Sequence, residues 1–596
     1  MIFLGINVSH GASASLMIDG EIILAYQEER FNKIKNFVGY PKKSIEECIK
    51  FVRDKNLKID EAGFSTINNL PFVFKYPLDN FFSIKDWLDY YLNDFFSEKE
   101  KIEQSIKKFN KFKKRKKINQ YLDFNKIKKK DYFVNYSLFR VIQKKFLEKQ
   151  AKGLIKKISF IEHHNCHAHY AAFAADIKEN KCAVISLDSE GDGINQTFWL
   201  FSKKKNKLVK INQSAECDLA RIYRFVTLIL KMKPNEHEYK VMGLAPYAKN
   251  EYSQIVYEKV FKDILKVKNC KIVHKKRPKN LFRFLYENTK EFRFDNIAGA
   301  VQILIEKISS ELFIQINKKY KINSFSISGG VSMNIKMNKN LASLPFVKKI
   351  YVAPTGTDES LAIGACYYLN KKYRTNKILK NIYLGQYLSN QKLTIETLIK
   401  KLNNIKKFTV KKNITHRQIA KLLKKGEIIA VARDKEEFGA RALGNRSILA
   451  NPSSNGIVQK INEQIKNRDF WMPFALTILN EKHQDLIINK KLLDCNFMTI
   501  GFDTKLKNYH KIKNGTHSYD KTVRPQILRK EYNENFHNII NEFNKITNIP
   551  ALLNTSLNLH GMPISSKLDD VIYTFINSGL KYLYLDDNFL VIKNRN

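Results

Sequence analysis

Cysteine is scarce in this chain, and its spacing excludes two common uses. The 596 residues hold seven cysteines, and no two of them form a C-x-x-C pair. Such a pattern supports neither a disulfide framework nor a zinc ribbon, and it fits a reducing compartment. Apolar runs of about 18 residues and a charged-then-apolar leader are absent too, so we expect no membrane span. The sequence therefore predicts a soluble, cytoplasmic protein.

Acidic residues are also few, since 58 Asp and Glu face 104 Lys and Arg, for a net charge of +46. Such a charge would suit nucleic acid or an anionic membrane. However, Lys, Ile, Asn, Phe and Tyr are all abundant while Ala and Gly are sparse, a bias typical of A/T-rich codons. No RNA-recognition signature accompanies the charge. We therefore expect no nucleic acid as the main partner, although the positive field would favour small anionic substrates.

Three widespread catalytic motifs are missing as well. The chain has no P-loop, no G-x-G-x-x-G and no G-x-S-x-G. Their absence excludes the common nucleotide-binding folds and the serine hydrolases that use them. The length, in contrast, is too great for one hydrophobic core, so two or more domains are expected.

The segment IEHHNCHAHY, followed by VISLDSEGDG, is the most informative part of the chain. His163 and His167 are four residues apart, which places both imidazoles on one face of a helix. Asp188 ends an apolar run that is typical of a buried strand, and Gly191 and Asp192 follow it. Two histidines and a carboxylate form the ligand set of non-haem iron and of zinc. The alternative is that these histidines are satisfied core residues, but the spacing favours a metal site.

The order of elements indicates an α/β protein with two domains. Residues 158–370 alternate strands and helices, and the strand at 324–328 runs into Gly329 and Gly330. A second strand, at 349–352, leads to Asp358. This order is typical of the duplicated actin-like ATPase fold, whose strand-end loops hold a metal nucleotide. The pattern weakens after residue 370, so we place the domain boundary near residue 385.

Residues 75–157 differ from the rest of the first domain because they are aromatic and rich in lysine. The basic runs at 107–117 and 126–130 are followed by helical periodicity over 137–155. We interpret this block as a basic helical insertion that forms a solvated lobe. The alternatives are a lid or a surface for a partner.

Basic residues beside glycines characterise the second domain. The loop EFGARALGNRS carries Arg441 and Arg446, and arginines beside glycines suit bidentate binding of oxyanions. Each signal is weak alone. Together they offer cations and a hydroxyl turn for two phosphate-bearing substrates; the other members are Lys466, Arg468, Arg524 and Ser556.

With these residues in view, the chain resembles the O-carbamoyltransferases of the nodulation-factor, tobramycin and cephalosporin type. The resemblance covers nearly the whole chain outside residues 75–157. Its motifs, in order, are HGASASLMIDG with EER, HHNCHA, SLDSEGDG, EYKVMGLAPY, SGGVSMN, TDESLAIGA, FGARALGNRS, VRPQ and NTSLNLHGMPI. The resemblance implies an α/β fold with an N-terminal actin-like (ASKHA, Kae1-like) duplicated domain at 1–385 and a C-terminal YrdC-like α/β domain at 386–596.

The resemblance also implies a reaction in two steps. Carbamoyl phosphate and ATP, with Mg, would give carbamoyl-adenylate and pyrophosphate in the second domain. The first domain would then transfer the carbamoyl group to a hydroxyl of a sugar or natural product and release AMP. Adenylation is needed because a carbamoyl group is a poor electrophile and AMP is a good leaving group.

Residue roles follow from the same resemblance. Phosphate and carbamoyl oxygens would be held by Arg441, Lys466, Arg524 and Ser556, with Arg446 and Arg468 among the cofactor-binding residues. A metal, iron in the resemblance, would be ligated by His163, His167, Asp188 and Asp358, and Gly191 and Asp192 would contact the cofactor beside it. His10 would orient the carbamoyl group or accept the acceptor's proton. Lys240 would contact phosphate, and Gly329, Gly330 and Asn334 would contact adenosine.

Two positions depart from the pattern of the relatives. Met472 stands between Trp471 and Pro473-Phe474, where close relatives have an arginine, so one phosphate-binding cation is missing. Arg468 could compensate, or substrate affinity is weaker. Asn36 stands where relatives often carry a histidine, with Lys33 and Lys35 nearby.

Several questions stay open at the level of sequence. The main alternative is a fused enzyme of transfer-RNA threonylcarbamoylation, although GARALGNRS differs from the Lys-Arg-rich motif of those partners. An actin-like sugar kinase would leave the second domain unexplained, and a basic scaffold would need neither ligand set. The ligands accept Mn or Zn as well as Fe(II). Neither the acceptor nor the oligomeric state follows from the sequence, and a homodimer is one option.

Overall fold

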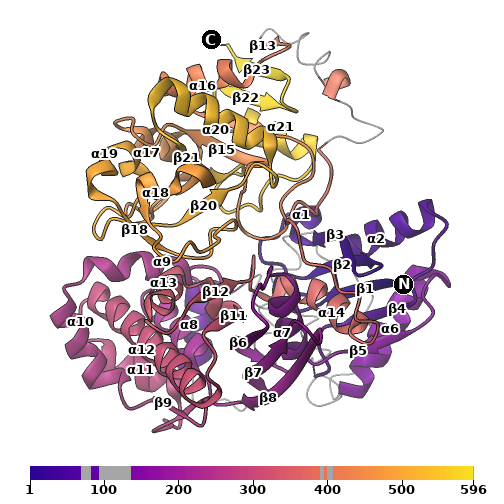
Figure 1. Cartoon of the computed structure of the whole chain (residues 1–596), viewed down its shortest axis with the longest axis vertical. Helices are drawn as coiled ribbons and strands as arrows, with labels where there is room; N and C mark the ends of the chain where they lie inside the picture. Colours follow the sequence, from indigo (N-terminus) through magenta and orange to yellow (C-terminus); the bar gives the residue numbers. More distant parts are fainter. Residues whose placement is uncertain (69–81, 93–135, 389–394, 399–406, 595–596) are drawn as a thin grey trace. The chain divides into compact units, whose positions relative to one another are not determined.

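The computed structural model describes residues 1–68, 82–92, 136–388, 395–398 and 407–594. The chain forms two compact units, Met1–Leu379 and Lys380–Asn596, both of mixed α/β structure (Figure 1). The sequence predicts the boundary near residue 385, a few residues later. Backbone hydrogen bonds from Gly385 to Glu436 and from Leu388 to Asp434 attach this stretch to the second unit.

The first unit begins with a five-stranded sheet in the order β3-β2-β1-β4-β5. Its strands are β1 (Ile2–Asn7), β2 (Ser13–Ile18), β3 (Glu21–Gln27), β4 (Glu61–Phe64) and β5 (Ile158–Phe160). The first three strands are antiparallel neighbours, whereas β4 and β5 run parallel to β1. Tight turns such as Asp19-Gly20, both with positive φ, join the antiparallel strands, as the Asp-Gly pair predicts.

A second five-stranded sheet in the same unit repeats this arrangement. Its order is β12-β11-β6-β7-β8. The strands are β6 (Lys181–Gly191), β7 (Ile194–Ser202), β8 (Lys207–Ser214), β11 (Ser324–Ser328) and β12 (Lys349–Val352). Strands β6, β7 and β8 are antiparallel neighbours, whereas β11 and β12 run parallel to β6. The same strand order and the same strand directions therefore occur twice.

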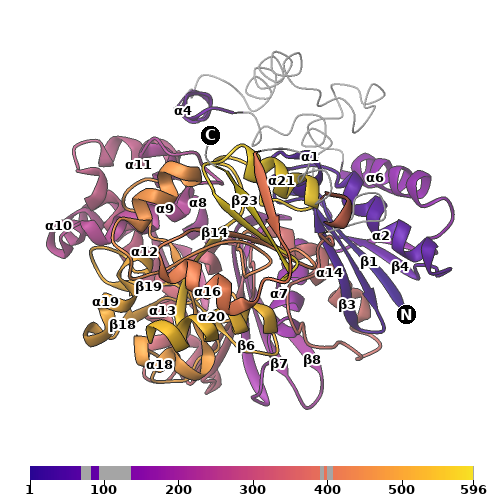
Figure 2. The same ribbon diagram turned by 90° about the horizontal axis from the view of Figure 1, so that it is seen from above.

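Two helices lie between the sheets (Figure 2). Helix α7 (His163–Phe173) follows β5, and helix α14 (Leu361–Asn370) follows β12. Helix α7 packs on β6, β7 and β11, whereas α14 packs on β1, β2 and β4. The two helices also pack on each other. Their amino-terminal ends consequently lie close to the loops that follow β1 and β6.

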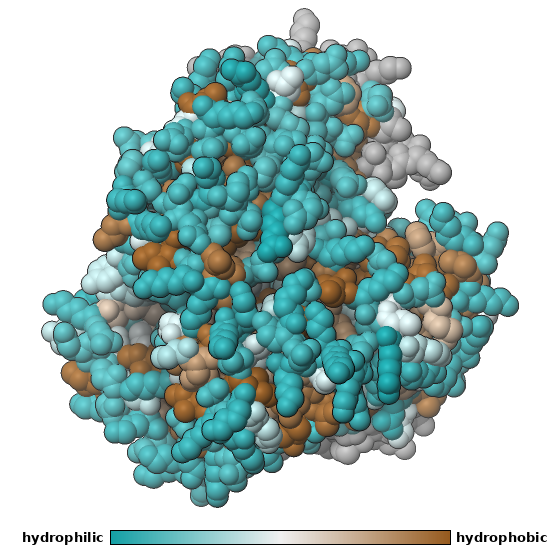
Figure 3. All heavy atoms as spheres, viewed as in Figure 1, coloured by the Kyte–Doolittle hydropathy of each residue, from teal (hydrophilic) through white to brown (hydrophobic). Residues whose placement is uncertain are grey.

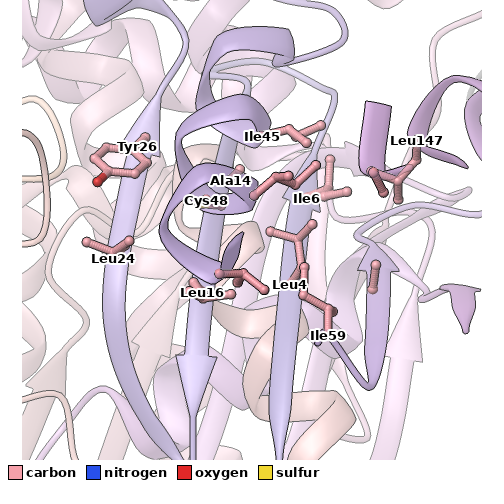
Figure 4. Packing of buried hydrophobic residues seen from close by; sticks show 14 of the residues in the cluster. Leu4, Ile6, Ala14, Leu16, Leu24, Tyr26, Ile45, Cys48, Ile59 and Leu147 are labelled. Carbon is pink, nitrogen blue, oxygen red and sulfur yellow. The ribbon is translucent and has the colours of Figure 1, made fainter. Parts of the chain in front are cut away.

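The outer face of the first sheet carries an apolar core (Figure 4). Helices α2 (Lys42–Asp54) and α6 (Tyr136–Ala151) cover this face. The core side chains include Leu4, Ile6, Ala14, Leu16, Leu24, Tyr26, Ile45, Cys48, Ile59 and Leu147. Because Leu147 and Ala151 are buried, helix α6 belongs to the core and not to a solvated lobe. The basic runs at 107–117 and 126–130 lie outside the described residues.

Helices surround the second sheet and form the rest of the first unit. They are α4 (Ile84–Leu92), α8 (Leu219–Ile229), α9 (Glu238–Leu244), α10 (Asn250–Val256), α11 (Leu281–Thr289), α12 (Phe294–Tyr320) and α13 (Ile335–Ser343), with the hairpin β9 (Leu265–Lys268) and β10 (Lys271–His274). The short helix α1 (Glu29–Asn32) instead follows β3 and contacts the first sheet. Helix α4, from the inserted block, packs on α8 and α11. Its Tyr91 ring lies 5.0 Å from Phe225 and 5.1 Å from Phe282, between ring centroids.

The second unit is built on an eight-stranded sheet in the order β13-β23-β22-β14-β15-β21-β16-β20. The strands are β13 (Phe408–Lys411), β14 (Ile429–Ala432), β15 (Arg446–Ala450), β16 (Ala475–Leu479), β20 (Pro525–Leu528), β21 (Ala551–Ser556), β22 (Tyr582–Leu585) and β23 (Phe589–Lys593). A small sheet holds β17 (Ile487–Ile488), β18 (Phe502–Thr504) and β19 (Thr522–Val523). The helices are α16 (His416–Lys424), α17 (Ile457–Ile461), α18 (His483–Leu486), α19 (Tyr509–Ile512), α20 (Glu534–Thr547) and α21 (Leu568–Ile576).

The molecular surface agrees with the high content of charged residues. The face in Figure 3 is largely hydrophilic, and its apolar side chains form small, separate patches. Among the described residues, every helix is too short or too polar to cross a bilayer. Most apolar side chains of the described residues are therefore buried in the cores of the two units.

Candidate functional site

Four side chains of the first unit meet at one point. Ligand atoms of His163, His167, Asp188 and Asp358 all lie within 4.8 Å of one another. The Nε2 atom of His163 is 3.2 Å from Oδ2 of Asp188 and 3.7 Å from Oδ1 of Asp358. The corresponding distances for Nε2 of His167 are 3.7 Å and 3.6 Å. The structure therefore brings together the four residues that the sequence analysis groups as metal ligands.

Local structure explains why they converge. Helix α7 starts at His163 because the side chain of Glu162 accepts hydrogen bonds from the amides of His164 and Asn165. With the helix fixed there, residues 163 and 167 fall on one face. Asp188 lies near the end of β6, and Asp358 opens a 3-10 turn just before α14. The candidate ligands thus lie near the ends of elements that the two sheets place at the same edge, with His167 one helical turn after His163.

The field at this point favours a cation. Burial lowers the pKa of His163, but the charges of Asp358 and Asp188 outweigh it and raise the pKa to about 9. Burial would raise the pKa of Asp188, yet the two imidazoles hold it well below its usual range. Buried carboxylates need compensating positive charge. Protonated imidazoles or a bound cation would supply that charge.

The donor set fits a metal ion. His167 is fully buried, and neither of its ring nitrogens has a hydrogen-bond partner among the described residues. Its Nε2 lies too far from both carboxylates for a good hydrogen bond, yet close enough for both groups to share an ion. Two imidazoles and two carboxylates match iron, manganese or zinc. Asp358 is the most exposed of the four, so the site is accessible on its side.

The neighbouring histidines of the same helix serve the fold. His164 is fully buried, with Nδ1 2.8 Å from the hydroxyl of Ser186 and Nε2 2.9 Å from the carbonyl of Ile194. Burial lowers the pKa of His164 well below its usual value and that of His169 to about 4. His169 lies among Phe173, Trp199 and Tyr368. Both are therefore neutral core histidines, as the alternative interpretation of this segment expects.

The glycines of the predicted cofactor loops make room for the ligands themselves. A Cβ atom on Gly191 would lie 2.2 Å from the ring of His163, and one on Gly330 would lie 2.9 Å from Oδ1 of Asp188. The Gly330 amide donates to that same oxygen at 3.0 Å. Gly329 has φ +89°, and a Cβ there would collide with the Leu187 carbonyl. The atoms that lie closest to these glycines therefore belong to the protein itself.

Asp192 and Asn334, which the sequence predicts to contact the cofactor, are both hydrogen-bonded to other parts of the protein. The Asp192 carboxylate accepts hydrogen bonds from residues 66–68 and from the His163 amide. Asn334 caps α13 by accepting from the Met337 amide, and its amide group exchanges two hydrogen bonds with Gln302. Sequence signals of loop position cannot reveal such internal partners.

The loop after β1 brings His10 toward the same site. The side chain of Asn7 donates to the His10 carbonyl and so fixes this loop. Burial raises the pKa of both Glu238 and Glu359, and His10 acts on each of them in the opposite direction. His10 is thus within electrostatic range of the residue next to Asp358.

Sequence reasoning misses one residue of this loop. The hydroxyl of Ser9 lies 2.9 Å from Oδ2 of Asp358 and so orients a candidate ligand. The available signal was its position beside His10 at the end of the first strand. Lys240, in helix α9, lies near His237. Burial lowers the pKa of His237, and the charge of Lys240 lowers it further.

A groove of about 630 Å³ with both polar and apolar lining lies between helices α10, α12 and α13. Its lining includes Glu306, Lys307, Ser310 and Asn340 beside the aliphatic side chains of three isoleucines. Glu306 accepts a hydrogen bond from Gln302, the partner of Asn334. The volume is in the range of small-molecule sites. A chain of hydrogen bonds therefore joins this groove to the loop after Gly330.

In the second unit, topology collects the predicted polar residues at one edge of the sheet. Strands β15 and β21 are antiparallel, with Ser447 opposite Ser556. Strand β16 begins beside the end of β21, and β20 begins beside β16, directly after Arg524. The loop with Arg441, a half-buried side chain, precedes β15. Each predicted residue of this domain thus lies next to this edge or in a loop that leads to it.

Two cations of this edge contact the hydroxyl turn after β21. The buried Lys466 places Nζ 3.2 Å from Oγ of Ser556 and 2.9 Å from Oδ1 of Asn558. Arg468 donates to the Thr555 hydroxyl at 2.8 Å and packs over the Phe474 ring. Ser556 and Lys466 are therefore one connected group.

Arg446 does not belong to this group, which corrects its assignment as a cofactor ligand. Its side chain is fully buried. The guanidinium donates to backbone carbonyls of residues 386, 433, 434, 445 and 566. A cation whose donors point at the protein's own carbonyls holds loops together and leaves no face for a phosphate.

Comparisons with known proteins agree with this division. A family described as "Carbamoyltransferase N-terminus" matches residues 2–367, and one described as "Carbamoyltransferase C-terminus" matches residues 420–593. Both units of the structure are therefore matched, each by its own half of one family.

Individual relatives match over most of their length. The chain is 30% identical to an uncharacterised protein of Methanocaldococcus jannaschii, covering 99% of this chain and all of that one. It is 25% identical to the nodulation protein NolNO of Sinorhizobium fredii, covering 96% and 77%. Among solved structures, phosphate- and nucleotide-bound HypF matches 62% of this chain and 55% of its own at 12% identity, with a TM-score of 0.34, which establishes no shared fold.

Proposed function

Since this chain belongs to the carbamoyltransferase family, and is thus a transferase enzyme, we propose that it is an ATP-dependent O-carbamoyltransferase with two steps. Carbamoyl phosphate and ATP would form carbamoyl-adenylate in the second unit. The first unit would pass the carbamoyl group to a hydroxyl of a sugar or natural product. A transfer-RNA acceptor is not favoured, because the relatives are nodulation proteins and uncharacterised proteins.

The first step needs cations around phosphate oxygens. The carbamoyl–phosphate bond breaks with water and releases phosphate, and a carbamate oxygen attacks the α-phosphorus of ATP and releases pyrophosphate. Lys466, with Ser556 beside it, is the best-placed group to hold the transferring oxygens. Arg441 and Arg524 supply further charge at this edge of the sheet, and Arg468 supplies a guanidinium where Met472 supplies none.

The second step needs a base and a charge sink. An acceptor hydroxyl attacks the carbamoyl carbon, its proton leaves, and AMP departs with the electrons of the carbonyl–phosphate bond. His10 is the candidate for that proton, because its loop carries Ser9 to within 2.9 Å of Asp358. The carboxylates that face this loop would help to hold the imidazole in place.

His163, His167, Asp188 and Asp358 would hold Fe(II), or Mn or Zn, and ATP would arrive with Mg. Such an ion would act as a Lewis acid toward the phosphate of the leaving group. The four residues would offer the ion two imidazole nitrogens, each after loss of its proton, and two carboxylates in a buried pocket. Lys240 would contribute a further positive charge from helix α9.

We extend the proposal to the fold of each unit. The repeated strand order of the two sheets supports an actin-like (Kae1-like) first unit. The groove between α10, α12 and α13 would then take the adenosine, since the Glu306–Gln302–Asn334 chain leads from it toward Gly330. A YrdC-like identity for the second unit belongs to the proposal as well.

The acceptor would bind near the inserted block. Helix α4 of that block packs beside Arg224, which donates to the Tyr91 hydroxyl and whose charge reaches Glu238. Aromatic rings with hydrogen-bonding tips suit a carbohydrate. A cytoplasmic location is also part of the proposal, supported by seven free, buried cysteines.

The observation that carries the proposal is the convergence of the four ligand atoms within a chain matched by the family in both units. The test is to incubate the purified full chain with ATP and carbamoyl phosphate, without acceptor, and to measure pyrophosphate. We expect pyrophosphate that depends on carbamoyl phosphate and that K466M removes. Pyrophosphate that forms without carbamoyl phosphate, or none at all with the metal loaded, would overturn the adenylation step.

A further inference from the structure

Asp192, in the loop between β6 and β7, makes an unusual number of hydrogen bonds for one carboxylate. Its Oδ1 accepts from the hydroxyl of Thr66 at 2.7 Å and from the amide of Asn68 at 2.8 Å. Its Oδ2 accepts from the amide of His163 at 2.8 Å. The amide of Ile67 is 3.1 Å from both oxygens. All lone pairs of the carboxylate are therefore engaged by two segments far apart in the chain.

The first of these segments is the start of α7, which carries two of the ligands. The opening amides of a helix have no partner within the helix. Glu162 satisfies those of residues 164 and 165, and Asp192 satisfies that of His163. A negative charge at this end is also favoured by the helix dipole. The backbone of His163 is thus fixed from outside the helix.

The same loop also fixes the ring of His163. Gly191 lies against the imidazole so closely that any Cβ would overlap it. Asp192 has φ +55°, a left-handed conformation that is unfavourable for most residues. Its four donors hold this backbone in place. Gly191 therefore packs against the ring of His163, and Asp192 holds its backbone amide.

The second segment is the root of the inserted block. Residues 65–68 follow β4, and they are the last described residues before the block begins. Arg140, on helix α6 at the other end of the block, donates to the Ile67 carbonyl at 3.3 Å. Both roots of the block therefore meet at the residues that Asp192 binds.

We propose that Asp192 is a positioning residue that locks His163 to the root of the inserted block, so that a cation at the ligand group and the order of this root stabilise each other. This inference rests on the proposed metal site. Outer partners that orient ligands are typically worth a 10- to 100-fold change in metal affinity. Because coupling is reciprocal, the cation should in turn protect the root.

The first test measures binding of Mn²⁺ to the full chain by titration calorimetry and electron paramagnetic resonance. We expect D192N to weaken binding about 10- to 100-fold. The matched control is E190Q, at the end of β6 two residues before Asp192, where the carboxylate is exposed and pairs with Arg221. It should bind like the wild type. Equal binding by D192N and wild type would overturn the proposal.

A second variant covers the case in which D192N does not fold. T66V removes one donor to Asp192 and leaves three. It should weaken Mn²⁺ binding by a smaller factor and leave the far-ultraviolet circular dichroism unchanged. Unaltered binding by folded T66V would count against the proposal in the same way.

Hydrogen exchange separates this inference from the proposed function. In the metal-free chain, D192N should accelerate exchange at the amides of Ile67, Asn68 and His163, and E190Q should not. In the wild type, Mn²⁺ should slow exchange at Ile67 and Asn68. If no cation binds to any form, the proposed metal site fails, whereas the metal-free comparison still decides whether Asp192 anchors both segments. Unchanged exchange in D192N would refute that anchoring.

Discussion

The two units place polar residues together in different ways. In the first unit, four ligand atoms point at one another, and the nitrogens of His167 have no hydrogen-bond partner among the described residues. In the second unit, the predicted residues share one edge of a sheet, but Arg446 is enclosed by backbone carbonyls. Grouping in space is thus not enough to make a site. What matters is whether each polar atom already has a protein partner.

The largest expected effect comes from breaking the first-unit group. H167A should abolish tight cation binding and slow carbamoyl transfer by about 10³-fold, because it removes one buried donor from the charged centre. Pyrophosphate formation, which we assign to the second unit, should persist. The measurement is parallel assay of metal content, pyrophosphate and carbamoylated product.

H169F is the control for that experiment, since His169 is a neutral histidine of the same helix that lies among aromatic rings. It should retain the cation. If H167A lost pyrophosphate formation and transfer to the same degree, the separation of the two activities would be wrong.

A different outcome is expected when the second-unit arginine is removed. R446M should lower the free energy of unfolding of the second unit by about 4 kcal/mol, because five buried carbonyl contacts lose their donor. R441M, in the same loop but only half-buried, should cost much less stability and reduce pyrophosphate formation. Urea titration monitored by fluorescence, with the pyrophosphate assay, distinguishes them. An R446M chain as stable as the wild type but weaker for ATP would restore Arg446 as a substrate ligand.

The first unit has a buried carboxyl group, that of Glu28, whose ionisation depends on pH. Burial raises the pKa of Glu28 to about 7, although three hydrogen bonds from residues 43 and 44 lower it. The folded pKa is above the unfolded one, so the stability this carboxyl confers is complete below about pH 4.5 and is lost as the pH rises through 7. The loss is on the order of 3 kcal/mol.

E28Q should remove this dependence. Unfolding free energies of wild type and E28Q, measured from pH 5 to 8, should converge or cross as the pH rises. E258Q, whose carboxylate is exposed and pairs with Lys262 far from Glu28 in the chain, is the control. Parallel pH profiles for wild type and E28Q would show that the carboxyl is already ionised at pH 5.

The smallest expected effect comes from adding a cation at Met472, where the family resemblance predicts an arginine. M472R should lower the KM for carbamoyl phosphate about fivefold, as one charge-assisted hydrogen bond would. M472L, which changes shape but adds no charge, should behave like the wild type. If M472R raised the KM, Arg468 would already occupy the phosphate position.

The sequence predicts well what depends on short spacing. His163 and His167 are linked by one turn of helix, and the strands at 324–328 and 349–352 form over the predicted residues. Asp358 could be proposed because it follows such a strand. Spacing within one element survives folding, so these inferences need no tertiary information.

The rest depended on contacts between distant segments. Nothing in GNRS reveals that Arg446 faces the carbonyls of residues 386 and 566. Likewise, the glycines at 191 and 330 are required by His163 and Asp188, which the sequence cannot place beside them. Helix α6 was assigned to the inserted block because its composition resembles that block, whereas burial of Leu147 places it in the core.

The crossed packing of α7 and α14 has a consequence for how the first unit folds. Helix α7 follows the last strand of the first sheet and packs on the second sheet. Helix α14 follows the last strand of the second sheet and packs on the first. Neither sheet can bury its inner face with helices from its own part of the sequence. The two halves should therefore unfold as one cooperative block. A chain cut between α7 and β6 would yield two fragments that gain structure only when they recombine.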